Sequence, residues 1–211
     1  MNSLLAIGIM TTLALSAIAG HIAAAKEYTP SVTVHLDVKA NVPFVTIMSA
    51  TGFATEIFYR AGVRLAWRMG QPEGTERRQP IIVEVVSNTP GSLSPGALAC
   101  AEAFEGIHVR LFYDRLQKFA DSPALPRFLG HVLAHEIAHI LQRTDRHSPT
   151  GVMKAHWTTE DILQMSRGRL LSFEPRDIAL IRQSLIDRAD AKAGASLGSN
   201  TNPARAPAPA Y

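Results

Sequence analysis

The chain has 211 residues, of which 46% are hydrophobic and 18% are charged, and this length supports one sizeable core but not two ordinary domains. Its formal net charge of +3 comes from scattered arginines and lysines without interleaved aromatic residues, so nucleic-acid binding is not predicted. Cys100 is the only cysteine, so an exported form would have no internal disulfide and would depend on its core and on any bound metal.

The N-terminal residues 1–25 predict a secretory signal. Residues 4–20 carry no charge and are mostly apolar, and small residues follow them before Lys26. We predict cleavage near Ala25, with Gly20 as the alternative, and therefore a secreted or periplasmic protein without stable membrane insertion. The apolar run is close to the length of a bilayer span, so an uncleaved segment that anchors the protein to a membrane is the alternative.

Hydrophobic periodicity predicts the next elements in chain order. Alternating apolar and polar residues predict a strand over 31–39, and apolar residues three and four apart predict a helix over 43–61. The remaining strands are predicted at 63–67, 81–86, 97–104 and 106–114. The first half of the chain therefore supplies all the predicted strands.

The second half is predicted to be helical. A helix is predicted over 121–142, where prolines occur only near the start, and a loop follows it. A short helix begins near Thr158. A last amphipathic helix over 174–189 has Pro175 in its first turn and Asp177 near its positive end, where a carboxylate is favourable.

The C-terminal residues 191–211 are small, polar and rich in alanine and proline. Ordering such a segment would cost backbone entropy without burying apolar surface. We therefore predict a disordered tail and a single folded domain over 26–190.

The predicted helix over 121–142 carries the pattern H-E-x-x-H. His135 and His139 are four residues apart and lie one turn apart on the same face, where two imidazole nitrogens can bind one ion. Glu136 lies beside them, where its carboxylate can accept a proton from a metal-bound water. His131 extends the same face by one turn, and we interpret it as a packing residue or a support for the ligands. The pattern predicts a catalytic zinc site.

A catalytic zinc ion needs a third protein ligand and leaves a fourth position for water. Three candidates follow His139: Asp145 after six residues, His147 after eight, and Glu160 after twenty-one, on the next predicted helix. Imidazole is the commoner third partner of zinc beside two histidines, but carboxylates also serve. The residues alone leave all three candidates open.

This stretch resembles the metzincin clan of zinc peptidases. In that clan a helical H-E-x-x-H is followed by a turn, a third ligand and a methionine turn beneath the metal, and Met153 in SPTGVM is similar to that methionine. The order of predicted elements from 31 to 190 also matches the clan. The resemblance implies an α+β, zincin-like fold: a twisted mixed sheet of about five strands, an active-site helix, a methionine turn and a C-terminal helix. Residues 97–104 would then be the edge strand that pairs with an extended substrate.

Two positions differ from the clan's pattern. Gln142 replaces the glycine at which members usually leave the helix, and Asp145 occupies the usual place of the third ligand. The stretch RHSPTGVM resembles the clan's segment from the third ligand to the methionine, and a loop two residues longer would bring His147 to the metal. We therefore predict His147 as the third ligand, with Asp145 as the alternative and Glu160 as the choice if the site resembles gluzincins instead.

The resemblance implies a zinc metalloendopeptidase, an atypical small secreted member of bacterial type that acts as a monomer on protein or peptide substrates. His135, His139 and His147 would hold Zn²⁺, and Glu136 would activate the attacking water. The alternative is a non-catalytic exported binding domain that contains zinc. Closed structural zinc sites usually include cysteines, and the single cysteine of this chain favours the enzyme.

Overall fold

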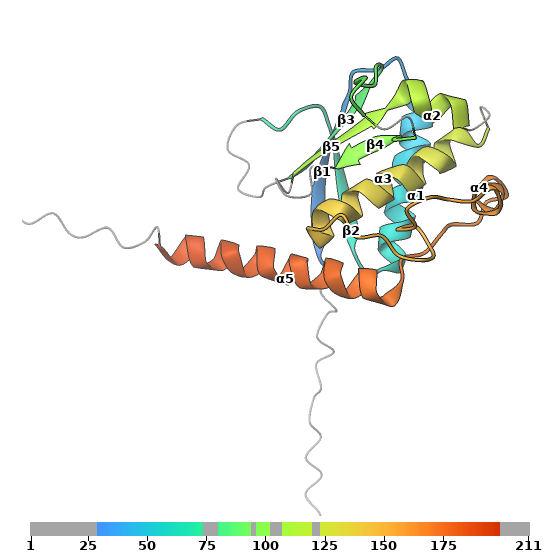
Figure 1. The fold of residues 1–211 in the computed structure, drawn as a ribbon. Helices are drawn as coiled ribbons and strands as arrows, with labels where there is room; N and C mark the ends of the chain where they lie inside the picture. The colour runs from blue at the N-terminus through green and yellow to red at the C-terminus, as the bar shows by residue number, and fades with distance from the viewer. Residues whose placement is uncertain (1–28, 74–79, 94–95, 102–106, 120–122, 199–211) are drawn as a thin grey trace, which may run out of the picture.

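The structure is a computed structural model that describes residues 29–73, 80–93, 96–101, 107–119 and 123–198 (Figure 1). The predicted signal 1–25 and residues 199–211 of the predicted tail lie outside the described residues. None of the described helices is both long enough and apolar enough to cross a membrane.

The helices and strands of the described residues follow the predicted order with one addition. They are β1 (Ser31–Val38), α1 (Phe44–Arg60), β2 (Arg64–Met69), β3 (Ile81–Val86), β4 (Ala99–Ala101), β5 (His108–Phe112), α2 (Tyr113–Phe119), α3 (Leu125–Gln142), α4 (Thr159–Ser166) and α5 (Pro175–Gly198). The addition is α2, which begins at Tyr113, where the predicted strand 106–114 was expected to continue. Asp114 in its first turn suits the positive end of a helix.

The five strands form one mixed sheet in the order β2-β1-β3-β5-β4. β1 pairs in parallel with β2 and β3, and β3 pairs in parallel with β5. β4 lies at the edge and pairs with β5 in the antiparallel direction. This arrangement confirms the predicted five-stranded mixed sheet, and β4 falls within the strand predicted at 97–104.

The two faces of the sheet differ in character. One face is buried beneath the helices. Its central row in register is Leu36, Val83 and Val109, exposed by 0%, 0% and 2%. On the opposite face Asp37, Glu84 and Arg110 lie side by side, and Lys39 forms ion pairs with Glu84 at 2.6 Å and with Asp37 at 3.5 Å. The helices therefore gather on the face without charges.

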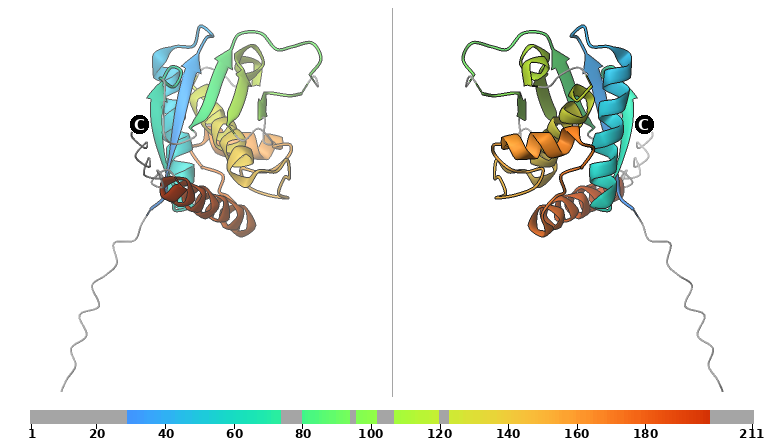
Figure 2. Two further views of the ribbon diagram at one scale, coloured as in Figure 1. Left: turned by 90° about the vertical axis from the view of Figure 1, so that its left-hand side faces the viewer. Right: turned by 90° about the vertical axis from the view of Figure 1, so that its right-hand side faces the viewer.

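α1 and α3 lie closely against each other, and α5 crosses below them (Figures 1 and 2). At the contact, a Cβ on Gly130 would be 2.8 Å from the carbonyl oxygen of Ala50 and 2.6 Å from the Cβ of Phe53. Only glycine allows this approach. The contact fixes the position of α3, which carries the H-E-x-x-H pattern.

The last helix is longer than predicted. α5 continues to Gly198, beyond residue 190, where we predicted that the folded domain would end. The sequence AKAGASLG in this extension contains alanine, lysine and leucine, which favour helix, so little burial is needed to continue the helix. The disorder of the remaining tail and the domain limits stay predictions.

Candidate metal centre

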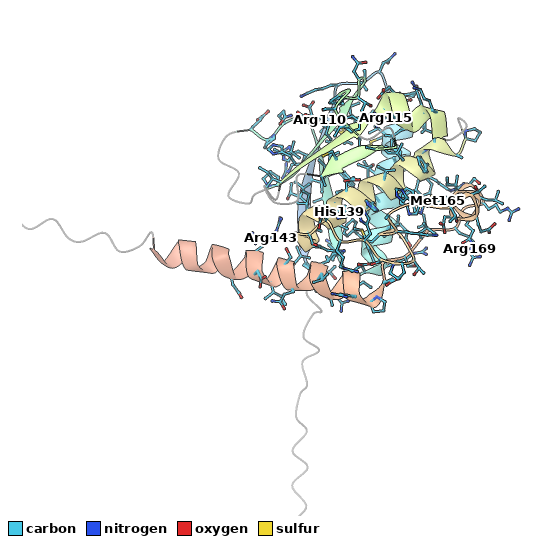
Figure 3. All side chains as sticks on the ribbon, viewed as in Figure 1. Arg110, Arg115, His139, Arg143, Met165 and Arg169 are labelled. Carbon is cyan, nitrogen blue, oxygen red and sulfur yellow. The ribbon has the colours of Figure 1, made fainter. Side chains whose placement is uncertain are left out.

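α3 brings two imidazoles together, with their ring planes at 78° to each other. His135 and His139 are exposed by only 9% and 6%, and their Nε2 atoms are 3.0 Å apart. Figure 3 labels His139 near the carboxyl end of α3, with Arg143 just beyond it. The spacing of four residues therefore produces the convergence that the sequence predicted.

Backbone carbonyls fix the tautomers of both rings. The Nδ1 of His135 donates to the carbonyl oxygen of Val152 at 2.8 Å, and the Nδ1 of His139 donates to that of Thr144 at 2.9 Å. A carbonyl oxygen can only accept, so each Nδ1 carries the proton and each neutral Nε2 presents a lone pair. Second partners of this kind commonly orient metal-binding histidines.

Both rings are uncharged at neutral pH. Burial, with the neighbouring His139, lowers the pKa of His135 to about 3, and burial also lowers the pKa of His139. Two lone pairs thus face each other across 3.0 Å, an arrangement that is unfavourable unless a cation lies between them. Two nitrogens bound tetrahedrally to zinc at about 2.0–2.1 Å would be about 3.3 Å apart, so the spacing suits that ion.

His147 completes a group of three imidazoles. Its ring centroid is 5.3 Å from that of His135 and 4.9 Å from that of His139. One ligand atom from each histidine lies within 4.8 Å of the other two. Among the described residues, this group can bind Zn²⁺, and Asp145 and Glu160 lie outside it. The assignment of His147 as the third ligand stays a prediction.

The chain leaves α3 later than the clan's pattern would place it. Gln142 is still helical and is 7% exposed, and Arg143 takes the left-handed conformation, with φ of 53° and ψ of 41°. This conformation is unfavourable for any residue except glycine. The turn therefore occurs one residue after the position of the clan's glycine.

Asp177 ties the loop after α3 to the start of α5. Its carboxylate is 0% exposed and accepts hydrogen bonds from Arg146 at 2.6 Å, from the Ser148 hydroxyl at 2.8 Å and from the Glu174 amide at 3.1 Å. Arg146 and Ser148 flank His147, so the carboxylate fixes both neighbours of the third imidazole. The sequence placed Asp177 in the first turn of a helix but gave no sign of this contact.

The segment after His147 forms a closed turn. The Ser148 amide donates to the carbonyl oxygen of Met153 at 2.8 Å, and the Met153 side chain is 0% exposed within the core. Gly151 has a φ of 75°, and a Cβ there would collide with the carbonyl oxygen of Ser172. The turn therefore requires glycine at this position.

His131 links α3 to the segment before α5 that supports this turn. Its Nδ1 donates to the carbonyl oxygen of Arg127 at 2.7 Å, and its Nε2 accepts from the Leu171 amide at 3.1 Å. The next residue, Ser172, accepts from the Val152 amide at 3.0 Å. The ring is 0% exposed and burial lowers its pKa, so the structure gives His131 a packing and supporting position, as interpreted from the sequence.

Glu136 lies in the same cleft as His135 and His147. Burial raises the pKa of its carboxyl group to about 8. A divalent cation held by the adjacent histidines would favour the charged carboxylate and lower this pKa. The carboxylate then has the charge that a general base requires.

The cleft has a volume of about 460 Å³ and opens beside the histidines. One wall comes from the edge strand β4 and the loop before it, and the opposite walls come from α3, from α4 and from residues 154–157. The lining residues besides the three named above are Gly96, Ala97, Leu98, Ala99, Phe128, Val132, Lys154, Ala155, His156, Trp157 and Ile162. The Trp157 ring packs edge-on against His135 at 5.8 Å between centroids. The sequence gave no sign of the place of Lys154 in this wall.

No family model matches the sequence, and no curated protein matches it. Solved structures do match. The archaemetzincin of Methanopyrus kandleri superposes with a TM-score of 0.50 at 16% identity, over 74% of this chain and 96% of that protein. A zinc-dependent peptidase from Methanocorpusculum labreanum gives a TM-score of 0.48 at 16% identity, over 70% of this chain and 99% of that protein. The chain has an archaemetzincin-like fold.

Proposed function

We propose that the protein is a zinc-dependent peptidase that cleaves within peptide chains. His135, His139 and His147 hold the metal, and Glu136 is the catalytic base. The observation that carries the proposal is the pair of Nε2 lone pairs facing each other at 3.0 Å, with a third imidazole beside them and a carboxylate in the same cleft. The archaemetzincin-like fold supports it, because the similar protein is named for this class of peptidase.

The chemistry divides between the metal and the protein. Zn²⁺, when bound, supplies Lewis acidity that polarises the scissile carbonyl and makes the attacking water more acidic. Glu136 removes the proton from that water and later delivers it to the leaving amine. The apolar walls of the cleft exclude bulk water and so strengthen the electrostatic interactions inside. The carbonyl oxygens of Val152 and Thr144 keep two imidazoles in the neutral, ligating tautomer.

Met153 serves in this proposal as the methionine of a methionine turn. Its complete burial and the hydrogen bond that closes the turn at Ser148 support the role. Its backbone neighbour Val152 holds His135, so the turn and the metal centre share a contact. The signal over 1–25 and export from the cytoplasm also remain part of the proposal.

Metal content and turnover test the assignment of ligands separately from that of the base. We expect the purified chain to bind one zinc ion and to cleave unfolded casein. His147→Ala should lose both zinc and cleavage, whereas Asp145→Ala, the matched control two residues away, should keep both. Loss of zinc and of cleavage only in Asp145→Ala would instead support Asp145, at the clan's usual spacing, as the third ligand.

Glu136→Gln tests the base. This variant should keep zinc and the fold and lose about 100-fold or more in kcat, the usual contribution of general-base catalysis. Zinc binding by the wild type without cleavage of any peptide would support the non-catalytic binding domain instead. A wild type that binds no zinc would remove the basis of the proposal.

A further inference from the structure

Lys154 places a positive charge in the wall of the cleft. It follows the buried Met153 directly, and its Nζ lies 2.7 Å from Oδ2 of Asp161 in α4. The Lys154 side chain is only 26% exposed, and it lines the cleft together with Glu136 and His147. The ammonium group is therefore held at a fixed place near the proposed metal centre.

The partner carboxylate is turned towards other donors. Asp161 does not line the cleft, and the same Oδ2 also accepts from the amide of Thr158 at 2.7 Å and from its hydroxyl at 2.8 Å. The bond from the Thr158 amide, together with the bond that the Asp161 amide donates to the Thr158 hydroxyl at 3.3 Å, forms the capping box at the start of α4. Three donors thus share one oxygen of the Asp161 carboxylate. The ammonium group of Lys154 has three N–H donors, so it keeps hydrogen-bonding capacity towards the cleft.

The charged side chains of the cleft are unevenly placed around the space that a substrate side chain would occupy. Among the described lining residues, Glu136 is the only carboxylate, and it lies beside the histidines, where it serves the reaction. The remaining walls are mainly apolar, with Phe128 and Val132 from α3 and Ile162 from α4. A side chain that enters the cleft therefore meets apolar surface along its stem and a single ammonium group at Lys154.

We propose that Lys154 makes this enzyme select substrates by charge: the cleft accepts an acidic or apolar side chain next to the scissile bond and rejects lysine and arginine. The inference rests on the proposed function and specifies its substrate class. A glutamate side chain buries its methylene groups against the apolar walls and pairs its carboxylate with Lys154. A cationic side chain brings like charge towards Lys154 and the zinc site, and the only carboxylate among the described lining residues is Glu136, which serves the reaction.

Cleavage of a mixture of synthetic peptides of random sequence, with the cut sites mapped by mass spectrometry, tests the inference. The full chain should cut where one position flanking the scissile bond is enriched in aspartate, glutamate or large apolar residues and depleted in lysine and arginine. Two peptides that differ only by glutamate or glutamine at that position should differ in kcat/KM by about tenfold in favour of glutamate.

Variants of Lys154 and Asp161 separate the effect of the positive charge from that of the ion pair between them. Lys154→Met should abolish the glutamate preference, so that the glutamate and glutamine peptides are cleaved with equal kcat/KM, and Lys154→Arg should retain the preference. Asp161→Asn removes the ion pair but leaves the ammonium group, so the preference should persist or increase. Lys39→Met, which removes an ion-paired lysine on the far face of the sheet, is the matched control and should show the cleavage preference of the wild type.

The outcomes distinguish the two proposals. Cleavage by the wild type without acidic enrichment at any flanking position would overturn the selection by Lys154 and leave the peptidase intact. Equal loss of preference in Lys154→Met and Asp161→Asn would overturn it as well, because the pair would then act only as a tether. Failure of the zinc-loaded wild type to cleave any peptide would overturn both.

Discussion

Replacement of Asp177 by alanine should be among the most destabilising single changes on α5. The carboxylate is buried completely and accepts bonds from Arg146, Ser148 and the amide of Glu174. Removal of one partner of a buried pair costs about 3–5 kcal/mol, and the 26% exposure of the Arg146 side chain lets water recover part of it. We expect a loss of about 3 kcal/mol in the free energy of unfolding for Asp177→Ala, and about 1–2 kcal/mol for Asp177→Asn, which keeps one acceptor.

Urea unfolding of the zinc-free chain at neutral pH measures both values. The control is Asp187→Ala on the exposed side of the same helix, where the carboxylate accepts from Gln183, and it should change the free energy by about 0.5 kcal/mol or less. Zinc affinity should also fall, by about tenfold in Asp177→Ala, because the neighbours of His147 are released. An unfolding free energy for Asp177→Ala within the range of the control would refute the anchoring role of the carboxylate.

Three further predictions concern the backbone and pH. Gly151→Ala should lower the free energy of unfolding by about 2 kcal/mol or more in urea titrations, because it adds a collision with Ser172 to an unfavourable φ of 75°; a neutral effect would contradict the geometry of the turn. Arg143→Gly should raise the free energy of unfolding by about 0.5–1 kcal/mol, since glycine accepts a φ of 53° at the end of α3 without strain. A destabilised variant would show that the contacts of the guanidinium outweigh the cost of the left-handed backbone. The hydrogen bond from Lys39 holds the pKa of Glu84 below its ordinary value, so its stabilisation is present above about pH 4.3 and is lost as the pH falls through the lower folded pKa. Lys39→Met should therefore reduce the free energy of unfolding at about pH 6, and this loss should shrink as the pH falls through the lowered folded pKa of Glu84; a loss that does not depend on pH would exclude the linkage.

Local patterns in the sequence predicted most of the fold. The alternation in β1 and β3 and the spacing in α1 and α3 reflect which side of each element is buried, and that information lies within a few neighbouring residues. α2 was missed because Tyr113 continues the apolar alternation of β5, while the change to helix depends on contacts with α3 and β3. The extension of α5 was not predicted because the segment has little apolar surface to bury, although several of its residues favour helix.

The part of the candidate site that lies on α3 was predictable from the sequence. The pair His135 and His139 follows from a spacing of four, and the structure brings them together as expected. His147 required a choice, because the loop length depends on where the helix ends. The residue that ends it, Arg143, takes a conformation that a sequence pattern assigns to glycine. Lys154 was missed because its role depends on α4 as well as on the turn.

The contacts that orient the imidazoles explain why sequence comparison finds so little while the fold is retained. His135 and His139 are held by carbonyl oxygens of Val152 and Thr144, and every residue type supplies such an oxygen. The side chains at these two positions do not make these bonds, and the backbone path is fixed by the Asp177 carboxylate and by the glycine of the turn. A chain with 16% identity to an archaemetzincin can therefore keep a similar fold, and in this chain the backbone around the three histidines is held by a few residues distant in sequence from them.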